Sequence, residues 1–203
     1  MAESNYHHGD LKNALIAAGV EILAREGIAS LSLRSVARRA GVSHSAPYAH
    51  FSDKQTLIAA ISTEGFRRLY SKLDTALNAH SAEPGRQLVA CGQAYMRFAL
   101  NERDIFKVMF SGVLEQEKEY PEFVEISQAT FQLLVKVVDA CQEKGILRPA
   151  PTDLLATAIW GQVHGLVSLA LEKQISHTVL DLHPLDEVLL FTLNQFSQVP
   201  LTL

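Results

Sequence analysis

Cysteine is scarce in this sequence, and no motif that would use it for disulfides or metals is present. The two cysteines, Cys91 and Cys141, lie far apart and form no CxxC pair. Both stand in apolar stretches of helical periodicity, so we expect buried, reduced thiols in a cytosolic protein. Redox sensing by one of them is the alternative.

Long hydrophobic runs are also scarce, and only one segment has the length of a membrane span. The N-terminus carries Glu3 and Asp10 and no apolar run, which argues against a signal peptide. From Leu154 to Leu171 eighteen residues carry no charge, which is at the lower limit for a transmembrane helix. Because polar residues interrupt this segment, we interpret it as a helix buried on both sides and expect no membrane contact.

Motifs of catalysis and of metal or cofactor binding are absent as well. The sequence contains no Gly-rich phosphate loop, no HExxH and no GxSxG. His7, His8, His164 and His177 lack partners at metal-ligand spacing. A hydrolase using His164 would need a nucleophile that the sequence does not supply, so we expect no enzyme, no metal and no cofactor.

The charges that are present are unevenly distributed along the chain. The net charge is −4, but residues 1–70 contain eight Lys/Arg and six Asp/Glu, whereas residues 71–203 contain ten and sixteen. Between residues 34 and 54 there are four basic residues and one acidic residue. This polarity suits a protein that presents one end to phosphates.

The stretch from Ser32 to Lys54 has the pattern of two short helices joined by a tight turn. Ser32 is a suitable N-cap, apolar residues follow at helical spacing, and Gly41 ends the first helix. Ser43 is the expected N-cap of a second helix, roughly His44 to His50. This pattern predicts a helix-turn-helix, whose second helix enters the major groove of DNA. An ordinary hairpin of helices is the alternative.

A longer composite pattern surrounds this stretch. It consists of ILAREG at the end of a first helix, then IASLSLRSVARRAGVS, and then PYAHFSDKQTLI. With these motifs, residues 6 to 66 resemble the N-terminal domain of the TetR (tetracycline-repressor-like) family of bacterial transcription regulators. The segments Tyr6–Leu11 and Trp160–Gly165 also resemble a branch of that family named for a C-terminal Trp-His-Gly motif.

Helical periodicity along the rest of the chain predicts an all-α protein of about nine helices, with no strand. This architecture resembles the TetR fold over the whole length. We expect residues 1–60 to form the helix-turn-helix DNA-binding domain and residues 61–203 the domain for effector binding and dimerisation. The boundary would lie within a long helix that begins near Lys54 and not at a flexible linker.

The family pattern implies DNA contacts for several residues of the first domain, although each of them can also be a simple cap or a solvated side chain. His44, Ser45 and Tyr48 match the positions that read base edges. Pro47 departs from the leucine of many relatives and weakens any prediction of the operator sequence. Arg34 would reach a guanine or a phosphate. The remaining phosphate contacts would be made by Ser32, Ser43, His50 and Lys54.

The resemblance also implies an effector pocket in the second domain. A bound small molecule would change the tilt of the long helix that begins near Lys54 and would thereby weaken DNA binding. Aromatic residues at helical spacing are also typical of an ordinary core, and both interpretations of Trp160 and His164 stay open. The candidate lining residues are Tyr95, Phe98, Phe106, Met109, Phe110, Trp160, His164 and Ser168.

The last two expected helices carry apolar residues on more sides than one neighbour covers. Leu155, Ile159 and Val163 share one side, whereas Ala158 and Leu169 point elsewhere. Such helices need a second partner, and the resemblance implies a homodimer through these helices; a monomer is the alternative.

These observations predict a cytoplasmic transcription regulator. We expect a repressor that a small-molecule effector releases from a near-palindromic operator in double-stranded DNA. The main rival is a ligand-binding helical protein without a DNA function. The sequence leaves the operator, the effector and the choice between repression and activation open.

Overall fold

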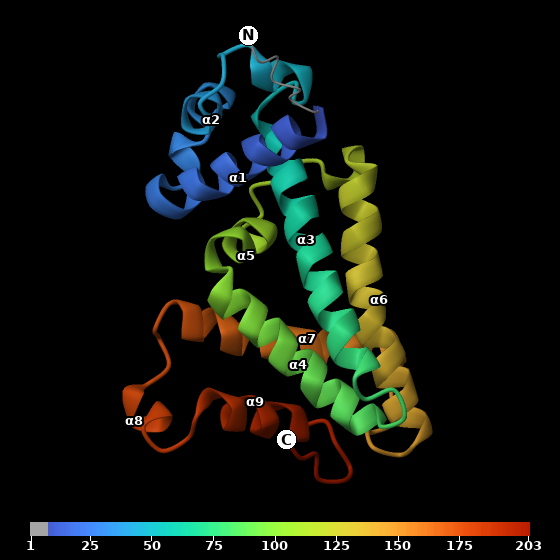
Figure 1. Ribbon diagram of the computed structural model, residues 1–203. Helices are drawn as coiled ribbons and strands as arrows, with labels where there is room; N and C mark the ends of the chain where they lie inside the picture. The colour runs from blue at the N-terminus through green and yellow to red at the C-terminus, as the bar shows by residue number, and fades with distance from the viewer. Residues whose placement is uncertain (1–7) are drawn as a thin grey trace. The chain divides into compact units, whose positions relative to one another are not determined.

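The computed structural model describes residues 8–203 and consists of helices within that range (Figure 1). Nine α-helices, three short 3-10 helices and an isolated β-bridge between Leu147 and Ser197 account for its regular structure. The prediction of an all-α protein is therefore confirmed. Tyr6 and His7, which belong to the expected N-terminal motif, lie outside the described residues.

The long helix expected to begin near Lys54 begins there, whereas the expected second helix of the helix-turn-helix is a short 3-10 helix. The elements are α1 (His8–Glu26), η1 (Ile28–Ser30), α2 (Leu33–Ala40), η2 (Ala46–Ala49), α3 (Lys54–Asn78), α4 (Pro84–Asn101), α5 (Arg103–Phe110), η3 (Glu117–Glu119), α6 (Pro121–Glu143), α7 (Thr152–Leu171), α8 (His177–Leu180) and α9 (Leu185–Asn194).

The chain packs into two compact units. The first comprises the chain up to Arg67 together with Asp104–Ile126, and the second comprises Arg68–Arg103 and Ser127–Leu203. The division passes through α3, so a single helix contributes to both units. The functional domains expected from the sequence, 1–60 and 61–203, stay a prediction, because packing alone does not assign function.

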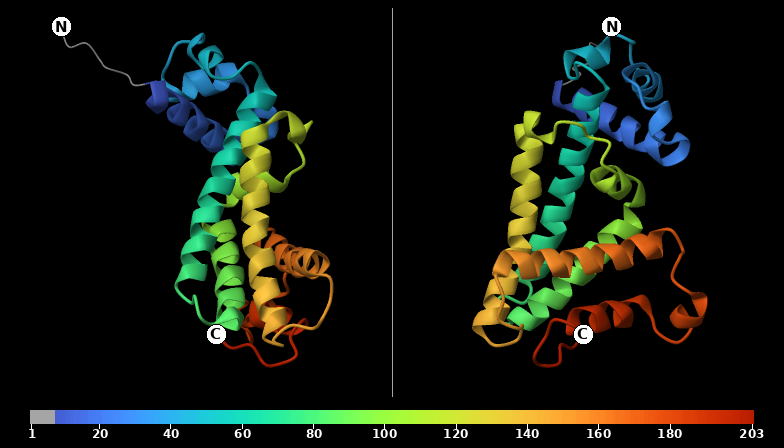
Figure 2. Two further views of the ribbon diagram at one scale, coloured as in Figure 1. Left: turned by 90° about the vertical axis from the view of Figure 1, so that its right-hand side faces the viewer. Right: turned by 180° about the vertical axis from the view of Figure 1, so that it is seen from behind.

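In the first unit, α1 and α2 pack against each other beside the start of α3 (Figure 2). Phe51, which follows the turn, is 1% exposed and closes this core, as its apolar character predicts. Farther along α3, Phe66 makes edge contacts with Phe110 of α5 and Phe123 of α6 at centroid distances of 5.5 and 5.6 Å. Other buried residues of the helix-turn-helix core are Leu15, Ile22, Leu31, Leu33, Val36, Ala37, Leu57, Ile58 and Ile61.

In the second unit, α4, α7 and α9 contact one another pairwise. Gly92 of α4 permits the close approach of α9, because a Cβ at this position would lie 3.4 Å from side-chain carbons of both Leu189 and Leu193. Gln93 donates a hydrogen bond of 2.9 Å to Asp186 and ties the same two helices together. The core of this unit therefore depends on residues that are far apart in the sequence.

Both cysteines are buried in this unit, as the sequence predicts. Burial raises the pKa of the Cys91 thiol to about 12 and that of the Cys141 thiol to about 12. Because the thiolate is the reactive form, burial argues against redox sensing by either residue.

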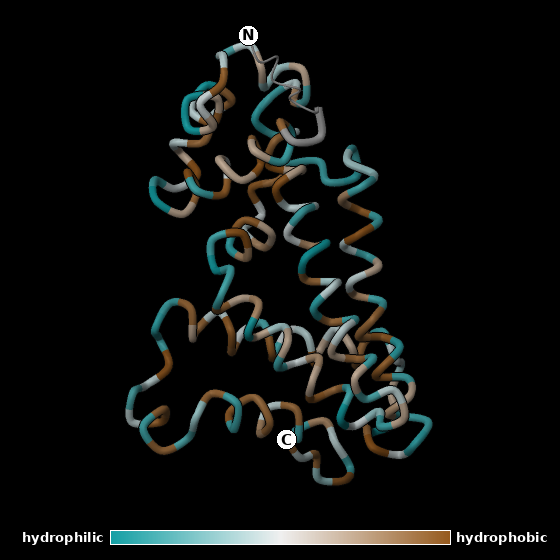
Figure 3. The backbone as a smooth tube through the Cα atoms, viewed as in Figure 1, coloured by the Kyte–Doolittle hydropathy of each residue, from teal (hydrophilic) through white to brown (hydrophobic). Residues whose placement is uncertain are grey.

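Helix α7 is less buried than the sequence suggests. It is long and apolar enough to cross a membrane by length and composition, with a mean hydropathy of 1.5, and 33% of that window is buried. The expectation of a helix buried on both sides is wrong for a single chain: Leu155, Ile159 and Val163 are buried, whereas Leu154 and Leu169 are exposed. Hydrophobic residues also recur along α9 (brown in Figure 3), where Phe191 is exposed.

Candidate DNA-binding surface and effector-binding residues

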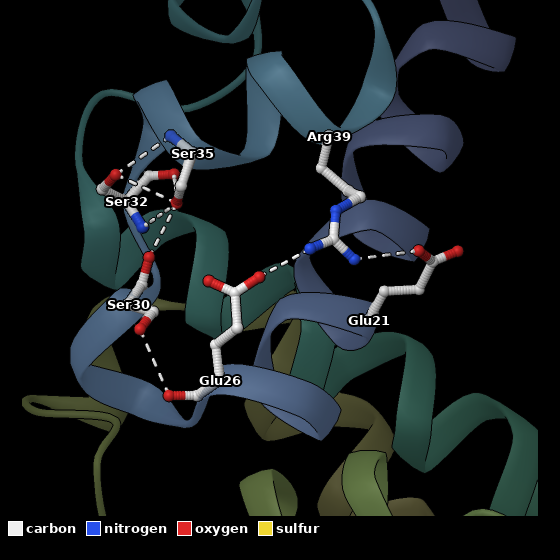
Figure 4. A network of polar contacts seen from close by, with 6 residues as sticks. All are labelled: Glu21, Glu26, Ser30, Ser32, Ser35 and Arg39. Carbon is white, nitrogen blue, oxygen red and sulfur yellow. Dashed lines mark hydrogen bonds and ion pairs between the residues drawn. The ribbon is translucent and has the colours of Figure 1, made fainter.

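The entry into α2 is held by a reciprocal pair of serine caps (Figure 4). The Ser32 hydroxyl accepts a hydrogen bond of 3.0 Å from the Ser35 backbone N–H, and the Ser35 hydroxyl accepts one of 2.9 Å from the Ser32 backbone N–H. The Ser35 hydroxyl also reaches the Ser30 carbonyl at 2.8 Å. The prediction that Ser32 is an N-cap is confirmed, and the buried Ser35 completes a capping box that the sequence analysis missed.

The turn after α2 has the predicted glycine geometry. Gly41 adopts the left-handed conformation, with φ 70° and ψ 27°, which an L-residue with a side chain adopts only at a cost. The Val42 N–H donates to the Ala37 carbonyl at 3.0 Å and satisfies one of the last free carbonyls of the helix. The chain therefore reverses directly after α2.

The recognition segment, which we define as His44–His50, differs from the prediction of an α-helix capped by Ser43. It contains the 3-10 helix η2, and no side chain caps its N-terminus. Pro47 supplies a physical reason, because it has no N–H to donate to the Ser43 carbonyl and its ring crowds that carbonyl in an α-helix. Backbone bonds join residues three apart instead, such as the 3.2 Å bond from the Tyr48 N–H to the Ser45 carbonyl.

The recognition segment buries Pro47 and exposes three of its polar residues. Pro47 is buried and anchors the segment, whereas Tyr48 is 56% exposed. His44 and Ser45 are exposed beside it, as the sequence predicts. The structure thus places His44, Ser45 and Tyr48 together at the surface of the first unit.

The candidate phosphate contacts lie before this segment, at its last residue and after it. Arg34 is exposed on the first turn of α2, and Ser43 is exposed in the turn. His50 is half-buried next to Phe51, with ring centroids 6.2 Å apart. The Lys54 ammonium donates a 2.8 Å hydrogen bond to the Ile28 carbonyl.

The start of α3 carries further contacts, made by Asp53 and Gln55. The Asp53 carboxylate accepts a 2.8 Å hydrogen bond from the Thr56 N–H, which with the Thr56 hydroxyl holds the pKa of Asp53 below its usual range. The Gln55 amide donates to the Val113 carbonyl at 3.2 Å and accepts from the Glu115 N–H at 3.1 Å. The loop after α5 is thereby attached to the first turn of α3.

Three of the candidate effector-binding residues form a hydrogen-bonded cluster in the second unit. The Tyr95 hydroxyl lies 2.7 Å from Nδ1 of His164, and the Trp160 indole N–H donates to the same hydroxyl at 3.3 Å. Phe131 of α6 packs edge-on to Trp160 at 6.2 Å and was missed from the sequence, since only its apolar spacing marks it. Tyr95, Trp160 and His164 therefore belong to one polar cluster in an aromatic setting.

The environment keeps this cluster uncharged near neutral pH. Burial raises the pKa of Tyr95 well above its usual range, while the bond from Trp160 opposes this shift. Burial lowers the pKa of His164 below its usual 6.5. With a neutral imidazole whose Nδ1 is unprotonated, Tyr95 donates its proton to His164 and accepts one from Trp160.

The other candidate effector-binding residues do not join this cluster. Phe106 and Met109 are buried on α5 in the first unit, and Phe110 stacks beside Phe106 at a centroid distance of 4.8 Å. Phe98 is buried on α4, and Ser168 is half-buried on α7. The structure therefore divides the candidates between its two compact units.

His164 is expected to make the stability of the protein depend on pH. Because its pKa is lower in the folded than in the unfolded state, the unfolded state binds the proton first as the pH falls below about 6.5. The free energy of unfolding of the parent should therefore be highest above this pH and decrease below it. Urea titrations at several pH values between about 5 and 8 measure this dependence.

The variant His164→Gln tests the assignment, because glutamine keeps a hydrogen-bonding group but does not titrate. We expect the variant to be less stable than the parent at pH 8 and to lose part of the decrease toward pH 5. Equal pH dependence in parent and variant would show that His164 is not the group responsible.

Two family descriptions match the chain. Residues 15–61 match "Bacterial regulatory proteins, tetR family", and residues 88–193 match "Tetracyclin repressor-like, C-terminal domain". The first match includes the whole helix-turn-helix, and the second includes the Tyr95, Trp160 and His164 cluster. Among individual proteins, the chain is 23% identical over 181 residues to the uncharacterised HTH-type transcriptional regulator YvkB of Bacillus subtilis (strain 168), covering 81% of this chain and 90% of YvkB.

Solved structures agree with this assignment. A protein of unknown function from Rhodococcus sp. RHA1 superposes with a TM-score of 0.79 at 31% identity, covering 97% of this chain and all of the other. A bacterial regulatory protein in the tetR family from Rhodococcus RHA1 superposes with a TM-score of 0.68 at 21% identity, covering 83% of this chain and 86% of the other. Together with the exposed helix-turn-helix, these matches show that the chain belongs to the TetR family of bacterial helix-turn-helix transcription regulators.

Proposed function

We propose that this TetR-family regulator is a cytoplasmic homodimeric repressor that binds a near-palindromic operator and is released by a small-molecule effector. The observation that carries the proposal is the exposed recognition segment. Tyr48 is 56% exposed between the buried anchors Pro47 and Phe51. A large side chain held at the surface by buried neighbours suits a residue that contacts another molecule.

We assign base reading to His44, Ser45 and Tyr48. The imidazole and the hydroxyl groups donate or accept hydrogen bonds at base edges in the major groove, and the Tyr48 ring can pack on a thymine methyl. His44 and Ser45 lie just before the 3-10 helix and Tyr48 lies within it, so this short segment would read few base pairs in each half-site. A dimer then gains specificity from two half-sites.

Phosphate contacts would hold the segment in place. Arg34 is exposed and makes no ion pair within the described part of the chain. Lys54 uses one of its protons for the Ile28 carbonyl, which leaves two for a phosphate oxygen. Ser32, Ser43 and His50 complete the proposed set of phosphate contacts at the two ends of the helix-turn-helix.

The exposed faces of α7 and α9 support dimerisation. Leu154 and Leu169 of α7 are 63% and 45% exposed, and Phe191 of α9 is 69% exposed. Gly161 and Gly165 lie between the two leucines, and a Cβ at either glycine would meet no neighbouring atom within 4 Å. This open, apolar face suits close packing against the same helices of a second copy. The apolar character of α7 is thereby explained without a membrane.

We assign effector contact to the cluster of Tyr95, Trp160 and His164. Its hydrogen-bonding groups stand among aromatic side chains, which suits an uncharged ligand with a polar group. An ordinary core with internally satisfied polar groups is the competing interpretation. Phe98 and Ser168 would extend the same site. Phe106, Met109 and Phe110, which belong to the first unit, stay candidates by resemblance to the family alone. We propose no catalytic role.

Selection of bound duplexes from a random-sequence DNA pool tests the proposed function. The full-length protein is used at moderate salt, before and after unfolding and refolding to remove any co-purified ligand. We expect enrichment of a near-palindrome with half-site centres about one helical turn apart, or a multiple of it. Failure to enrich any sequence in both preparations would contradict the proposal and favour a helical ligand-binding protein.

A further inference from the structure

Arg39, in the last turn of α2, is held by two carboxylates of α1 (Figure 4). Its guanidinium contacts Glu26 at 2.5 Å and Glu21 at 3.4 Å, and both distances are those of ion pairs. The Arg39 side chain is 29% exposed, compared with 38% for Glu26 and 57% for Glu21. The three residues connect the last turn of α2 with the C-terminal part of α1.

The other arginines of α2 behave differently. Arg34 and Arg38 are exposed, and neither makes an ion pair within the described part of the chain. Among the arginines of α2, Arg39 is therefore the one whose charge is offset by carboxylates of α1 within the described part of the chain. A guanidinium whose charge is offset by two nearby carboxylates attracts a phosphate less strongly than an unpaired guanidinium does.

The position of Arg39 relates the ion pairs to DNA recognition. It lies two residues before Gly41, where the chain turns toward the recognition segment. Val36 and Ala37 of α2 are buried, and apolar packing of this kind tolerates small rotations because it is non-directional. The contacts of the guanidinium with two separate carboxylates of α1 are directional and restrict the rotation of this last turn. A rotation there would move the recognition segment as a whole.

We propose that Arg39 is a positioning residue for operator recognition, which acts through Glu21 and Glu26 of α1 and does not contact DNA. The inference rests on the proposed DNA-binding function. The ion pairs fix the orientation of the recognition segment relative to α1. Their loss therefore lowers the preference for the operator over other DNA, while the general attraction to phosphates stays.

The test compares two ways of breaking the same ion pairs. One variant is Arg39→Gln, and the other combines Glu21→Ala with Glu26→Ala. The probes are the duplex enriched by the parent protein and a scrambled duplex of equal length, measured over a range of salt concentrations. We expect both variants to lose roughly tenfold in the ratio of operator to scrambled affinity, the size of loss seen when a coupled network is broken.

The double variant shows whether the ion pairs affect DNA binding by positioning the recognition segment or only through their charge. Removing two acidic residues makes the protein less negative, so a pure charge effect would strengthen DNA binding. Positioning predicts weaker operator binding instead. Arg39→Gln should also leave the salt dependence of scrambled binding unchanged, whereas a lost phosphate contact would lower the log–log slope by about 0.9 per subunit.

Arg38→Gln is the matched control, because it removes the same charge from the neighbouring exposed position. We expect it to keep the operator preference within about twofold. The inference is overturned if the double acidic variant binds the operator as tightly as the parent, if Arg39→Gln lowers the salt slope, or if thermal stability falls while the preference stays intact. If the parent enriches no duplex, the proposed function fails, and this inference falls with it.

Discussion

Tyr48→Ala is expected to abolish sequence-selective DNA binding while leaving the fold and the dimer intact. The side chain is 56% exposed, so its removal costs little packing. A base contact contributes about 1–3 kcal/mol, and a symmetric dimer loses it in both half-sites. We therefore expect operator affinity to fall on the order of 100-fold, with little change on scrambled DNA. Fluorescence anisotropy with both duplexes measures the two affinities.

Tyr48→Phe shows which part of the side chain matters. If the hydroxyl donates or accepts at a base edge, phenylalanine should behave like alanine. If the ring packs on a thymine methyl, phenylalanine should retain most of the affinity. Circular dichroism and sedimentation must first show that both variants keep their helicity and their assembly state. Parent-like operator affinity for Tyr48→Ala would mean that the recognition segment does not dock as proposed.

Phe191→Glu is expected to convert the proposed dimer into monomers. The phenylalanine is 69% exposed in a single chain, so the substitution should be tolerated by the isolated subunit. In a twofold interface it would bury a carboxylate from each subunit without a partner, which is strongly unfavourable. We expect the dissociation constant of the dimer to rise at least about 100-fold. Sedimentation velocity over a range of concentrations measures this change.

Leu100→Glu is the control for this substitution. Leu100 lies on α4, is 40% exposed and stands outside the proposed interface, so the variant should remain dimeric. A parent that stays monomeric at all concentrations would support the alternative of a single-chain protein. A parent dimer that Phe191→Glu leaves intact would place the interface on another surface.

The helix-turn-helix was predictable because its signals are local. Ser32 and Gly41 act through backbone groups within a few residues, and their chemistry restricts the conformations available there. Phe51 is apolar in a polar neighbourhood and is therefore drawn into the core. Each of these residues has the role that the sequence suggests.

The recognition segment shows where local interpretation went wrong. A proline in the first turn of a helix is ordinarily tolerated, which led to the expectation of an α-helix from His44 to His50. In the structure Pro47 is buried, and the segment closes as a 3-10 helix with bonds between residues three apart. The relevant signal was present, but burial of the proline ring depends on the surrounding core.

The sequence predicted which residues belong to the candidate sites better than it predicted how those residues are arranged in space. Trp160 and His164 share a helix face by spacing alone, but their link to Tyr95 joins residues of α4 and α7. Nothing in the sequence indicates that Tyr95 reaches them while Phe106 belongs to a different packing unit. The pairing of Arg39 with Glu21 and Glu26 is similar, because no helical spacing relates these positions.

The sequence alone determines four features: the helical class, the turn at Gly41, the cap at Ser32 and the membership of the TetR family. These features depend on backbone chemistry and on motifs within short windows. The folded chain had to reveal that Arg39 pairs with carboxylates of α1, that Tyr95 meets His164, and that one face of α7 is left open. Those features arise from contacts between helices far apart in sequence. Burial and charge pairing act through distance in space, which packing establishes only once the chain has folded.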